Sequence, residues 1–262
     1  MPRFAVIIPA AGSSARFGAP KLIQDLAGLP VIARALLPFV QRSDTHQVLV
    51  AVPNEPMTLA NPAVPAAVPI LLTSPQPPGL MPAGRVNEVW EALSCEPSIR
   101  NRLGGQVGLV PGGANRAASV RAALRCIPGE IEWVAIHDAA RPLLSQELID
   151  RTLAAAVEYG AAAPALPVGL TIKQTSADAL PAQVQRTVPR GQLWAMQTPQ
   201  IMRRQVLQRA FDECVYPLEH ITDDLQLLEL AGETAWLIPG DERNIKITTP
   251  MDLLLAELLL RR

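Results

Sequence analysis

The sequence predicts an α/β fold in which helices cover both faces of a mostly parallel β-sheet. Short apolar runs rich in β-branched residues alternate with helical stretches along most of the 262 residues. These runs are almost continuously apolar, which is typical of parallel strands that are buried on both faces. With 49% hydrophobic and 18% charged residues, the chain can also bury a full core. We therefore expect one three-layer α/β domain over residues 1–262.

Seven short apolar runs are expected as strands, over residues 4–8, 47–52, 107–110, 133–136, 161–167, 235–238 and 245–247. Helices are expected between most of them, over residues 31–40, 117–126, 146–159, 203–211 and 223–230. Thr222 and Thr249 stand at N-cap positions, and Gly160 and Gly232 at C-cap positions. In "TTPMD", Pro250 stands at the first position of a helix that ends the chain.

Two segments interrupt this alternation. Residues 53–102 contain a dense set of prolines with one short helical stretch near 88–93, so we expect a partly irregular insertion at the surface. Residues 167–190 contain two extended pieces around a polar turn. This second pattern predicts a projecting β-arm, an element that can embrace a second subunit.

Charge and cysteine content narrow the classes of protein. The net charge of −1 gives no overall attraction to nucleic acid or to an acidic membrane, so any anion site has to be local. The three cysteines fit neither a disulfide framework nor a zinc site. The apolar C-terminal stretch "MDLLLAELLLRR" is too short to span a bilayer. We expect a cytoplasmic protein with no nucleic-acid or membrane partner.

The stretch "PAAGSSARFGAPK", residues 9–21, follows the first expected strand. Its small residues would let a ligand approach backbone N–H groups, and Arg16 and Lys21 would neutralise an anion such as a triphosphate. The stretch has neither the G-x-G-x-x-G pattern of dinucleotide-binding proteins nor a Walker A loop. The alternative is an ordinary tight turn.

Three further stretches place charged residues at strand ends, where ligands bind in an open parallel sheet. "PGGANRAASV" carries Arg116 and Ser119, "AIHDAARPLL" carries Asp138 and Arg141, and "ERNIKITTP" carries Lys246. The alternatives are a plain turn, a structural ion pair between Asp138 and Arg141, and a lysine that faces solvent from an edge strand. Together the stretches favour a nucleotide-using transferase that holds a polyphosphate and a second phosphorylated compound.

Six stretches then occur in a recognisable order: "PAAGSSARF…PK", "GGANRAASV", "HDAARP", "TVPRGQLWAMQTPQ", "ITDD" and "NIKIT". In this order they resemble the 2-C-methyl-D-erythritol 4-phosphate cytidylyltransferase family of non-mevalonate isoprenoid biosynthesis, over nearly the whole chain except about residues 54–105. The resemblance implies a Rossmann-like nucleotidyltransferase domain in which the phosphate of methylerythritol phosphate attacks the α-phosphorus of CTP and pyrophosphate leaves. It also implies Mg²⁺ bound mainly through the CTP phosphates, and a homodimer formed through the β-arm.

The resemblance implies roles for individual residues as well. Arg16 and Lys21 would stabilise charge on the transition state and the leaving group. Arg190 and Lys246 would position the attacking phosphate, and Asp138 would hold substrate hydroxyls or ribose. The other substrate-binding residues that it implies are Arg141 and Thr198 near the attacking phosphate, Ala10, Ala11, Gly113 and Ser119 around the cytosine and its ribose, and also Gly12 and Arg116.

Four positions depart from the family pattern, the mildest being Ser14, where many members have glycine. Ala114 stands where the family usually has an acidic residue, and Leu170 and Pro189 stand where the arm usually has aspartates. Because of the arm and the insertion, a nucleotide-binding homologue without catalysis is one alternative. A related ribitol 5-phosphate cytidylyltransferase is another. A dehydrogenase on a similar sheet is opposed by the missing glycine pattern.

Overall fold

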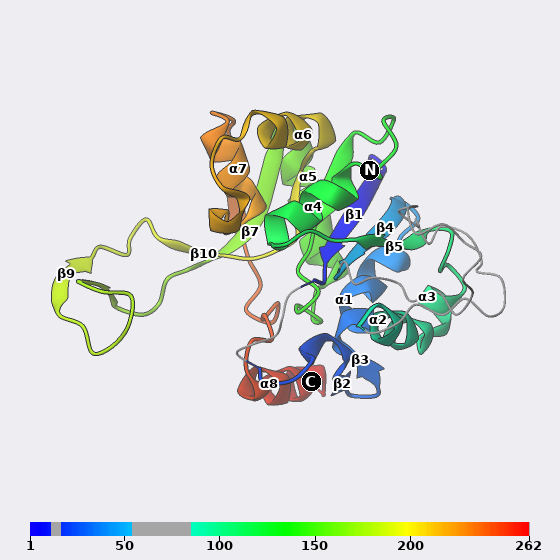
Figure 1. The fold of residues 1–262 in the computed structure, drawn as a ribbon, viewed down its shortest axis with the longest axis horizontal. Helices are drawn as coiled ribbons and strands as arrows, with labels where there is room; N and C mark the ends of the chain where they lie inside the picture. Colours follow the sequence, from blue (N-terminus) through cyan, green and yellow to red (C-terminus); the bar gives the residue numbers. More distant parts are fainter. Residues whose placement is uncertain (12–16, 54–84, 262) are drawn as a thin grey trace, which may run out of the picture.

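The computed structural model describes residues 1–11, 17–53 and 85–261, which form a sheet between two layers of helices (Figure 1). The strands of this sheet are β1 (Phe4–Pro9), β4 (Thr45–Val52), β5 (Val107–Pro111), β6 (Trp133–Ile136), β7 (Ala161–Pro167), β10 (Trp194–Met196), β11 (Gln200–Arg203) and β12 (Trp236–Pro239). Their order is β10-β7-β11-β6-β1-β4-β5, and β12 pairs with β7. β1 lies parallel to β4 and β6, whereas β11 runs antiparallel between β6 and β7. The predicted mostly parallel sheet is confirmed.

The alternating side chains of β1 explain the two helical layers. Phe4, Val6 and Ile8 belong to one core cluster, and Ala5 and Ile7 to the other, as expected for a strand buried on both faces. The first cluster includes side chains of α1 (Val31–Val40), α2 (Arg85–Ser94), α3 (Pro97–Arg100) and α5 (Gln146–Tyr159). The second includes side chains of α4 (Arg116–Leu124), α6 (Arg204–Glu213) and α7 (Asp224–Leu230). These two clusters confirm the predicted three-layer fold.

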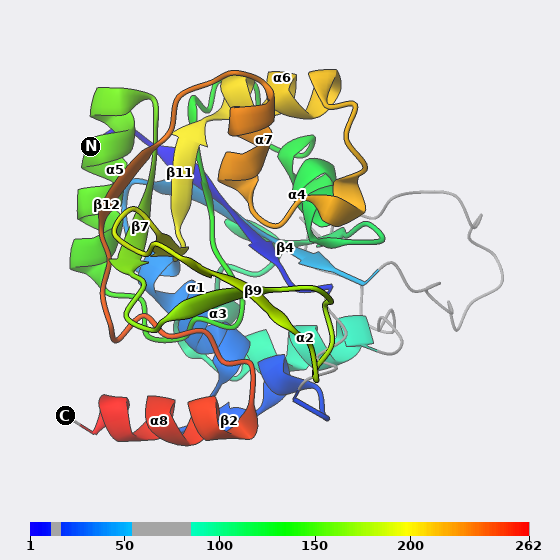
Figure 2. The same ribbon diagram turned by 90° about the vertical axis from the view of Figure 1, so that its left-hand side faces the viewer.

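The last helix lies outside the two layers. α8 (Pro250–Leu260) packs beside the hairpin of β2 (Asp25–Leu26) and β3 (Leu29–Pro30), as Figure 2 shows. Its start confirms the sequence signals, because Thr249 and Asp252 form a capping box around Pro250. Two 3₁₀ turns complete the described elements, η1 (Lys21–Ile23) and η2 (Leu218–His220).

Helix positions were predicted well, but both caps of α7 lie one residue inside the predicted positions, and its C-cap is Ala231 rather than Gly232. α1 and α5 span the predicted residues, and Gly160 ends α5 with φ 93°. Thr222, however, is not the N-cap of α7: the Asp223 side chain caps the helix by accepting from the Gln226 N–H at 3.0 Å. Carboxylate caps satisfy the same orphan N–H groups as hydroxyl caps, so the sequence "TDD" left the choice between neighbouring residues ambiguous.

The expected strand at 245–247 is wrong, and four strands were missed: β2 and β3 of the short hairpin, and β10 and β11 of the main sheet. Residues 245–247 form no strand, and the Ile247 N–H donates to the Ala140 carbonyl at 2.8 Å. Residues 245–247 lie beside the loop after β6, and a loop does not provide the regular row of backbone hydrogen bonds that a strand needs. β10 and β11 flank the residues "QTP", whose proline and polar side chains concealed the two short strands.

The predicted β-arm is present. β8 (Ile172–Thr175) and β9 (Val184–Val188) pair antiparallel in a sheet of their own that projects from the body (Figure 1). At the base of the arm, β7 and β10 pair so that Pro167 lies opposite Trp194. Of the predicted insertion at 53–102, residues 54–84 lie outside the described residues. The remainder holds α2 and α3, and α2 contains the expected helical stretch.

A buried histidine fixes the loop after β6. β11 pairs with β6 so that Gln200 lies opposite Ile136, which brings Thr198 beside His137. His137 Nε2 lies 3.1 Å from the Arg141 carbonyl oxygen, which can only accept, so Nε2 carries the proton. The Thr198 hydroxyl therefore donates to Nδ1 at 2.9 Å, and its oxygen accepts the Asp138 N–H at 3.1 Å. This arrangement requires a neutral imidazole, and burial lowers the pKa of His137 to about 4.

We expect His137 to make the fold less stable as the pH falls. Its pKa is about 4 in the folded chain and 6.5 in the unfolded chain, so the unfolded chain binds the proton first. The free energy of unfolding should therefore fall by about 3 kcal/mol as the pH drops through this interval. Urea unfolding of the wild-type protein and of His137→Gln, at a series of pH values, would measure it.

Carboxylates that titrate in the same pH range also change the free energy of unfolding. His137→Gln retains all of these carboxylates, so the difference between the two proteins isolates the contribution of His137. Wild type should lose about 3 kcal/mol more than His137→Gln between neutral pH and pH about 4. Parallel curves for the two proteins would contradict a buried neutral His137.

Candidate active site

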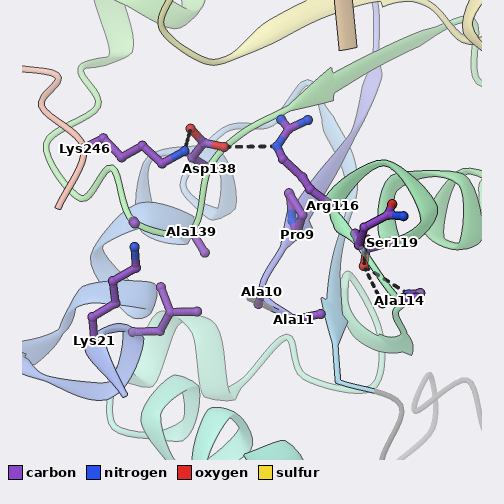
Figure 3. Close-up of a pocket in the computed structure, with 14 residues that line it drawn as sticks. Pro9, Ala10, Ala11, Lys21, Ala114, Arg116, Ser119, Asp138, Ala139 and Lys246 are labelled. Carbon is purple, nitrogen blue, oxygen red and sulfur yellow. Dashed lines mark hydrogen bonds and ion pairs between the residues drawn. The ribbon is translucent and has the colours of Figure 1, made fainter. Parts of the chain in front are cut away.

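A cavity of about 440 Å³ opens where the loops after β1, β5 and β6 meet (Figure 3). These are the carboxyl ends of neighbouring parallel strands, the place where such sheets bind ligands. In the figure, Lys21 and Lys246 lie on one side of the cavity, and Arg116 and Ser119 on the other. The residues predicted from sequence that line it are Ala10, Ala11, Lys21, Gly113, Arg116, Ser119, Asp138 and Lys246.

The loop after β5 forms a wall built from small residues. A Cβ atom on Gly113 would lie 2.4 Å from the Ala118 Cβ, so this position needs glycine. The Ser119 hydroxyl accepts the Gly113 N–H at 3.0 Å and donates to the Asn115 carbonyl at 2.8 Å. The Asn115 side chain in turn caps α4 by accepting the Ala118 N–H. These contacts hold the loop in place before any ligand arrives.

Asp138 is the centre of charge in the site. Its side chain is 10% exposed and lies between three cations. Its Oδ2 is 3.0 Å from Lys246 Nζ and 3.3 Å from Arg141 Nε, and its Oδ1 is 3.4 Å from Arg116 Nε. Burial alone would raise the pKa of Asp138, but the three cations hold that pKa well below its usual range. Asp138 is therefore ionised whenever the protein is folded near neutral pH.

The Arg141 side chain binds other groups of the protein. Besides the ion pair with Asp138, it donates to the Asn244 carbonyl at 2.8 Å and to the Met196 carbonyl at 3.1 Å. It is 8% exposed and is not among the residues that line the cavity. The structural ion pair that the sequence left open is thus present. Its effect is to tie the segment that carries Lys246 to the loop after β6.

Two buried polar residues that the sequence analysis did not select also support this segment. Asn244 donates to the Thr198 carbonyl at 2.8 Å, and the Gln197 side chain donates to the Asp241 carbonyl at 2.8 Å and accepts the Asp241 N–H at 3.0 Å. A Cβ atom on Gly240 would lie 2.5 Å from the Gln197 amide oxygen, so glycine makes room for this contact. The signal for both residues was a polar side chain within an apolar motif, "QTP" and "NIKIT".

Arg116 connects the cavity to a further buried carboxylate. Its Nη2 lies 2.7 Å from Asp224 Oδ2, and its Nε faces Asp138. Burial alone would lower the pKa of Arg116, but the carboxylates of Asp224 and Asp138 outweigh burial and raise it. The guanidinium is therefore charged and held between two acids. Asp224 belongs to the motif "ITDD", for which sequence reasoning gave no role.

The remaining predicted residues are not brought into the cavity. Thr198 is buried and forms hydrogen bonds with His137 and Asp138. Arg190 is exposed at the base of the arm, where it donates to the Gly169 carbonyl. Gly12 and Arg16 lie outside the described residues. The roles implied for these residues stay predictions.

The arrangement suits a phosphorylated ligand that is bound rather than attacked by the protein. Lys21, Lys246 and Arg116 line the cavity with a single carboxylate among them, which is Asp138. Among residues 1–11, 17–53 and 85–261, no three histidine, cysteine, aspartate or glutamate side chains gather as a metal site. Within the same residues no helix has the length and apolar character needed to cross a membrane.

Comparison with known proteins agrees with this description. The model of the 2-C-methyl-D-erythritol 4-phosphate cytidylyltransferase family matches residues 83–262. A relative of that name from Frankia casuarinae is 36% identical over 266 residues, which cover 100% of this chain and 82% of the relative. One from Gloeobacter violaceus is 36% identical over 260 residues, which cover 98% of this chain and 95% of the relative.

A solved structure gives the same result for the fold. The crystal structure of the 2-C-methyl-D-erythritol 4-phosphate cytidylyltransferase from Thermus thermophilus superposes with a TM-score of 0.68 at 30% identity, and the match covers 100% of both chains. The family model matches more than half of the chain, and the relatives align with nearly all of it. The chain therefore belongs to the 2-C-methyl-D-erythritol 4-phosphate cytidylyltransferase family, a family of CTP-dependent nucleotidyltransferases of isoprenoid biosynthesis.

Proposed function

We propose that the cavity described above is where this chain carries out the family's reaction. The phosphate oxygen of 2-C-methyl-D-erythritol 4-phosphate attacks the α-phosphorus of CTP, a new P–O bond forms, and pyrophosphate leaves. The observation that carries the proposal is the meeting of four separate sequence motifs at one cavity lined by Lys21, Lys246 and Arg116. Such a reaction needs positioning and charge stabilisation more than covalent chemistry from the protein.

Lys21 and Lys246 contact different phosphate groups in this proposal. Lys21, with Arg16 five residues before it in the chain, stabilises charge that develops on the triphosphate as pyrophosphate leaves. Lys246 holds the attacking phosphate, together with Arg190 from the arm. In the structure Lys246 is already 3.0 Å from Asp138, which keeps its ammonium group at the edge of the cavity. Asp138 retains acceptor capacity for a substrate hydroxyl, because a carboxylate has about four lone-pair sites.

The cytosine is proposed to lie against the small-residue wall. Ala10 and Ala11 line the cavity together with Gly113 and Ser119, and these small residues leave backbone groups accessible to a base and its ribose. Ala114 lies beside Ser119 on the same wall (Figure 3), so recognition of the base depends on backbone groups there rather than on an acidic side chain.

Mg²⁺ is proposed to enter with CTP, bound to its phosphates. The described residues do not fit a protein-held magnesium ion, because Asp138 is the one carboxylate among those that line the cavity and three cations already surround it. A metal brought by the nucleotide needs no such cluster. Omitting Mg²⁺ from the assay below is the corresponding check.

We further propose a cytoplasmic homodimer in which the arm of one protomer reaches the site of its partner. The arm projects from the body, and Arg190 at its base is not among the residues that line the cavity of its own protomer. If the reaction needs Arg190, the arm of a partner protomer can supply it to the cavity. Three unpaired cysteines fit the reducing cytoplasm.

The first experiment follows pyrophosphate release by purified protein with CTP, Mg²⁺ and 2-C-methyl-D-erythritol 4-phosphate. Release is expected with this substrate, and not with ribitol 5-phosphate in a parallel reaction. Release with ribitol 5-phosphate alone would keep the chemistry and change the substrate. CTP binding without any release would favour the non-catalytic alternative.

Lys21→Ala should lower kcat about 10²–10³-fold, because removing one preorganised donor from a developing charge typically costs that much. The fold should survive, since Lys21 lies in a short 3₁₀ turn and is partly exposed. Arg100→Ala, at the exposed end of α3, is the matched loss of a cation away from the cavity and should leave kcat unchanged. A fall of less than about threefold in Lys21→Ala would mean that the triphosphate lies elsewhere.

Mixing two inactive variants tests whether Arg190 acts across a dimer. Arg190→Ala alone should impair use of the polyol phosphate more than use of CTP. If protomers of Lys21→Ala and Arg190→Ala are allowed to exchange, each mixed dimer contains one site with Lys21 from one protomer and Arg190 from the other. About a quarter of wild-type activity should then return, since half of the dimers are mixed and each has one intact site. No recovery in verified mixed dimers would show that Arg190 does not act in the partner's site.

A further inference from the structure

Asp224 is a buried carboxylate that the proposed reaction does not use. It is 0% exposed and is the first residue of α7. Its recorded ion pair is with Arg116, at 2.7 Å between Asp224 Oδ2 and Arg116 Nη2. A buried carboxylate costs free energy unless a charged partner offsets it, so its presence here calls for a reason beyond the helix start.

The surroundings of Asp224 hold it rigidly. The Gln200 side chain accepts the N–H groups of Asp224 and Leu225 at 2.9 and 3.2 Å, and it donates to the Asp223 carboxylate at 2.8 Å. Gln200 belongs to β11, so the start of α7 is fixed to the central sheet. Burial raises the pKa of the Asp224 carboxyl, and the Arg116 guanidinium, whose Nη2 lies 2.7 Å from Asp224 Oδ2, opposes that rise by favouring the ionised form. The ion pair is thereby held at a fixed place beside the site.

The geometry of Arg116 shows what this charge does. A guanidinium that meets one carboxylate prefers to face it with two parallel N–H···O bonds. Arg116 does not face Asp138 in this way: only its Nε approaches, at 3.4 Å, while Nη2 is turned to Asp224. Asp138 is left to share its other oxygen between Lys246 and Arg141.

We propose that Asp224 is a positioning residue that keeps Arg116 from closing on Asp138. Without the charge of Asp224, the guanidinium turns to pair with both oxygens of Asp138. The carboxylate is then drawn away from Lys246, and Lys246 loses the contact that holds it at the cavity edge. The inference rests on the proposed roles of Asp138 and Lys246 in holding the polyol phosphate.

The test is the kinetics of Asp224→Asn, which removes the charge while the shape is nearly unchanged. We expect the KM for the polyol phosphate to rise about tenfold, because one charge-assisted hydrogen bond is lost, while kcat changes less than about threefold. Asp223→Asn is the matched control next to it in the chain, and asparagine can still cap α7. This control should leave both constants unchanged, even if its melting temperature falls.

A double-mutant cycle shows whether Asp224 acts through Arg116. Once Arg116→Gln has removed the guanidinium, adding Asp224→Asn should have no further effect on the KM. It should also raise the melting temperature, because Arg116→Gln leaves Asp224 buried without a partner. If the two effects on the KM multiply instead, Asp224 does not act through Arg116 and the proposal is wrong.

Other outcomes are also decisive. A KM in Asp224→Asn within threefold of wild type would overturn the positioning role. So would a loss of kcat in proportion to the unfolded fraction, with an unchanged KM, since that indicates a structural role alone. If Asp224→Asn does not fold, Asp224→Ser is measured against the same criteria. A wild-type protein with no turnover would instead refute the proposed function. The coupling between Asp224 and Arg116 would then be tested by the melting temperatures of the variants in the double-mutant cycle.

Discussion

The site depends on one carboxylate that three cations share. Asp138 ends up buried, ionised and in contact with Arg116, Arg141 and Lys246, which come from three separate parts of the chain. Removing any one partner would take away one of the three cations that keep this buried carboxylate ionised, so the three segments are coupled through this group. The distances, between 3.0 and 3.4 Å, are long for charge-assisted bonds. A carboxylate held by several such contacts can exchange one of them for a ligand.

The sheet explains why these segments meet. β6 delivers Asp138 at its carboxyl end, while β11 runs antiparallel beside it and delivers Thr198 from its amino end to the same place. The buried contacts of His137, Gln197 and Asn244 then fix the loops to one another. Most of the polar contacts around the cavity are thus made between parts of the protein. Through Asp138 and Arg141 these buried contacts support Lys246 and Arg116, two of the cations that line the cavity.

The larger elements could be predicted from the sequence because local patterns determine them. Apolar runs and capping residues placed β1, α1 and α5, and strand ends with cations placed the cavity. Long-range contacts could not be read in this way. The side chains of Thr198 and Arg141 make buried internal bonds that the sequence did not predict, and their ligand-binding roles stay predictions. No role was assigned to Asp224 from the sequence, because its ion-pair partner Arg116 is more than a hundred residues away in the chain.

The base of the β-arm has a consequence for assembly. Because Pro167 on β7 lies opposite Trp194 on β10, the arm leaves and rejoins the sheet at neighbouring points. Topologically it is a long hairpin extension, and none of the sheet order depends on the residues between those points. The body can therefore complete its folding within one chain, with the arm closing locally, and this needs no contact with the partner of the proposed homodimer. The same geometry lets the length and sequence of the arm, including Leu170 and Pro189, diverge without disturbing the core that carries the cavity.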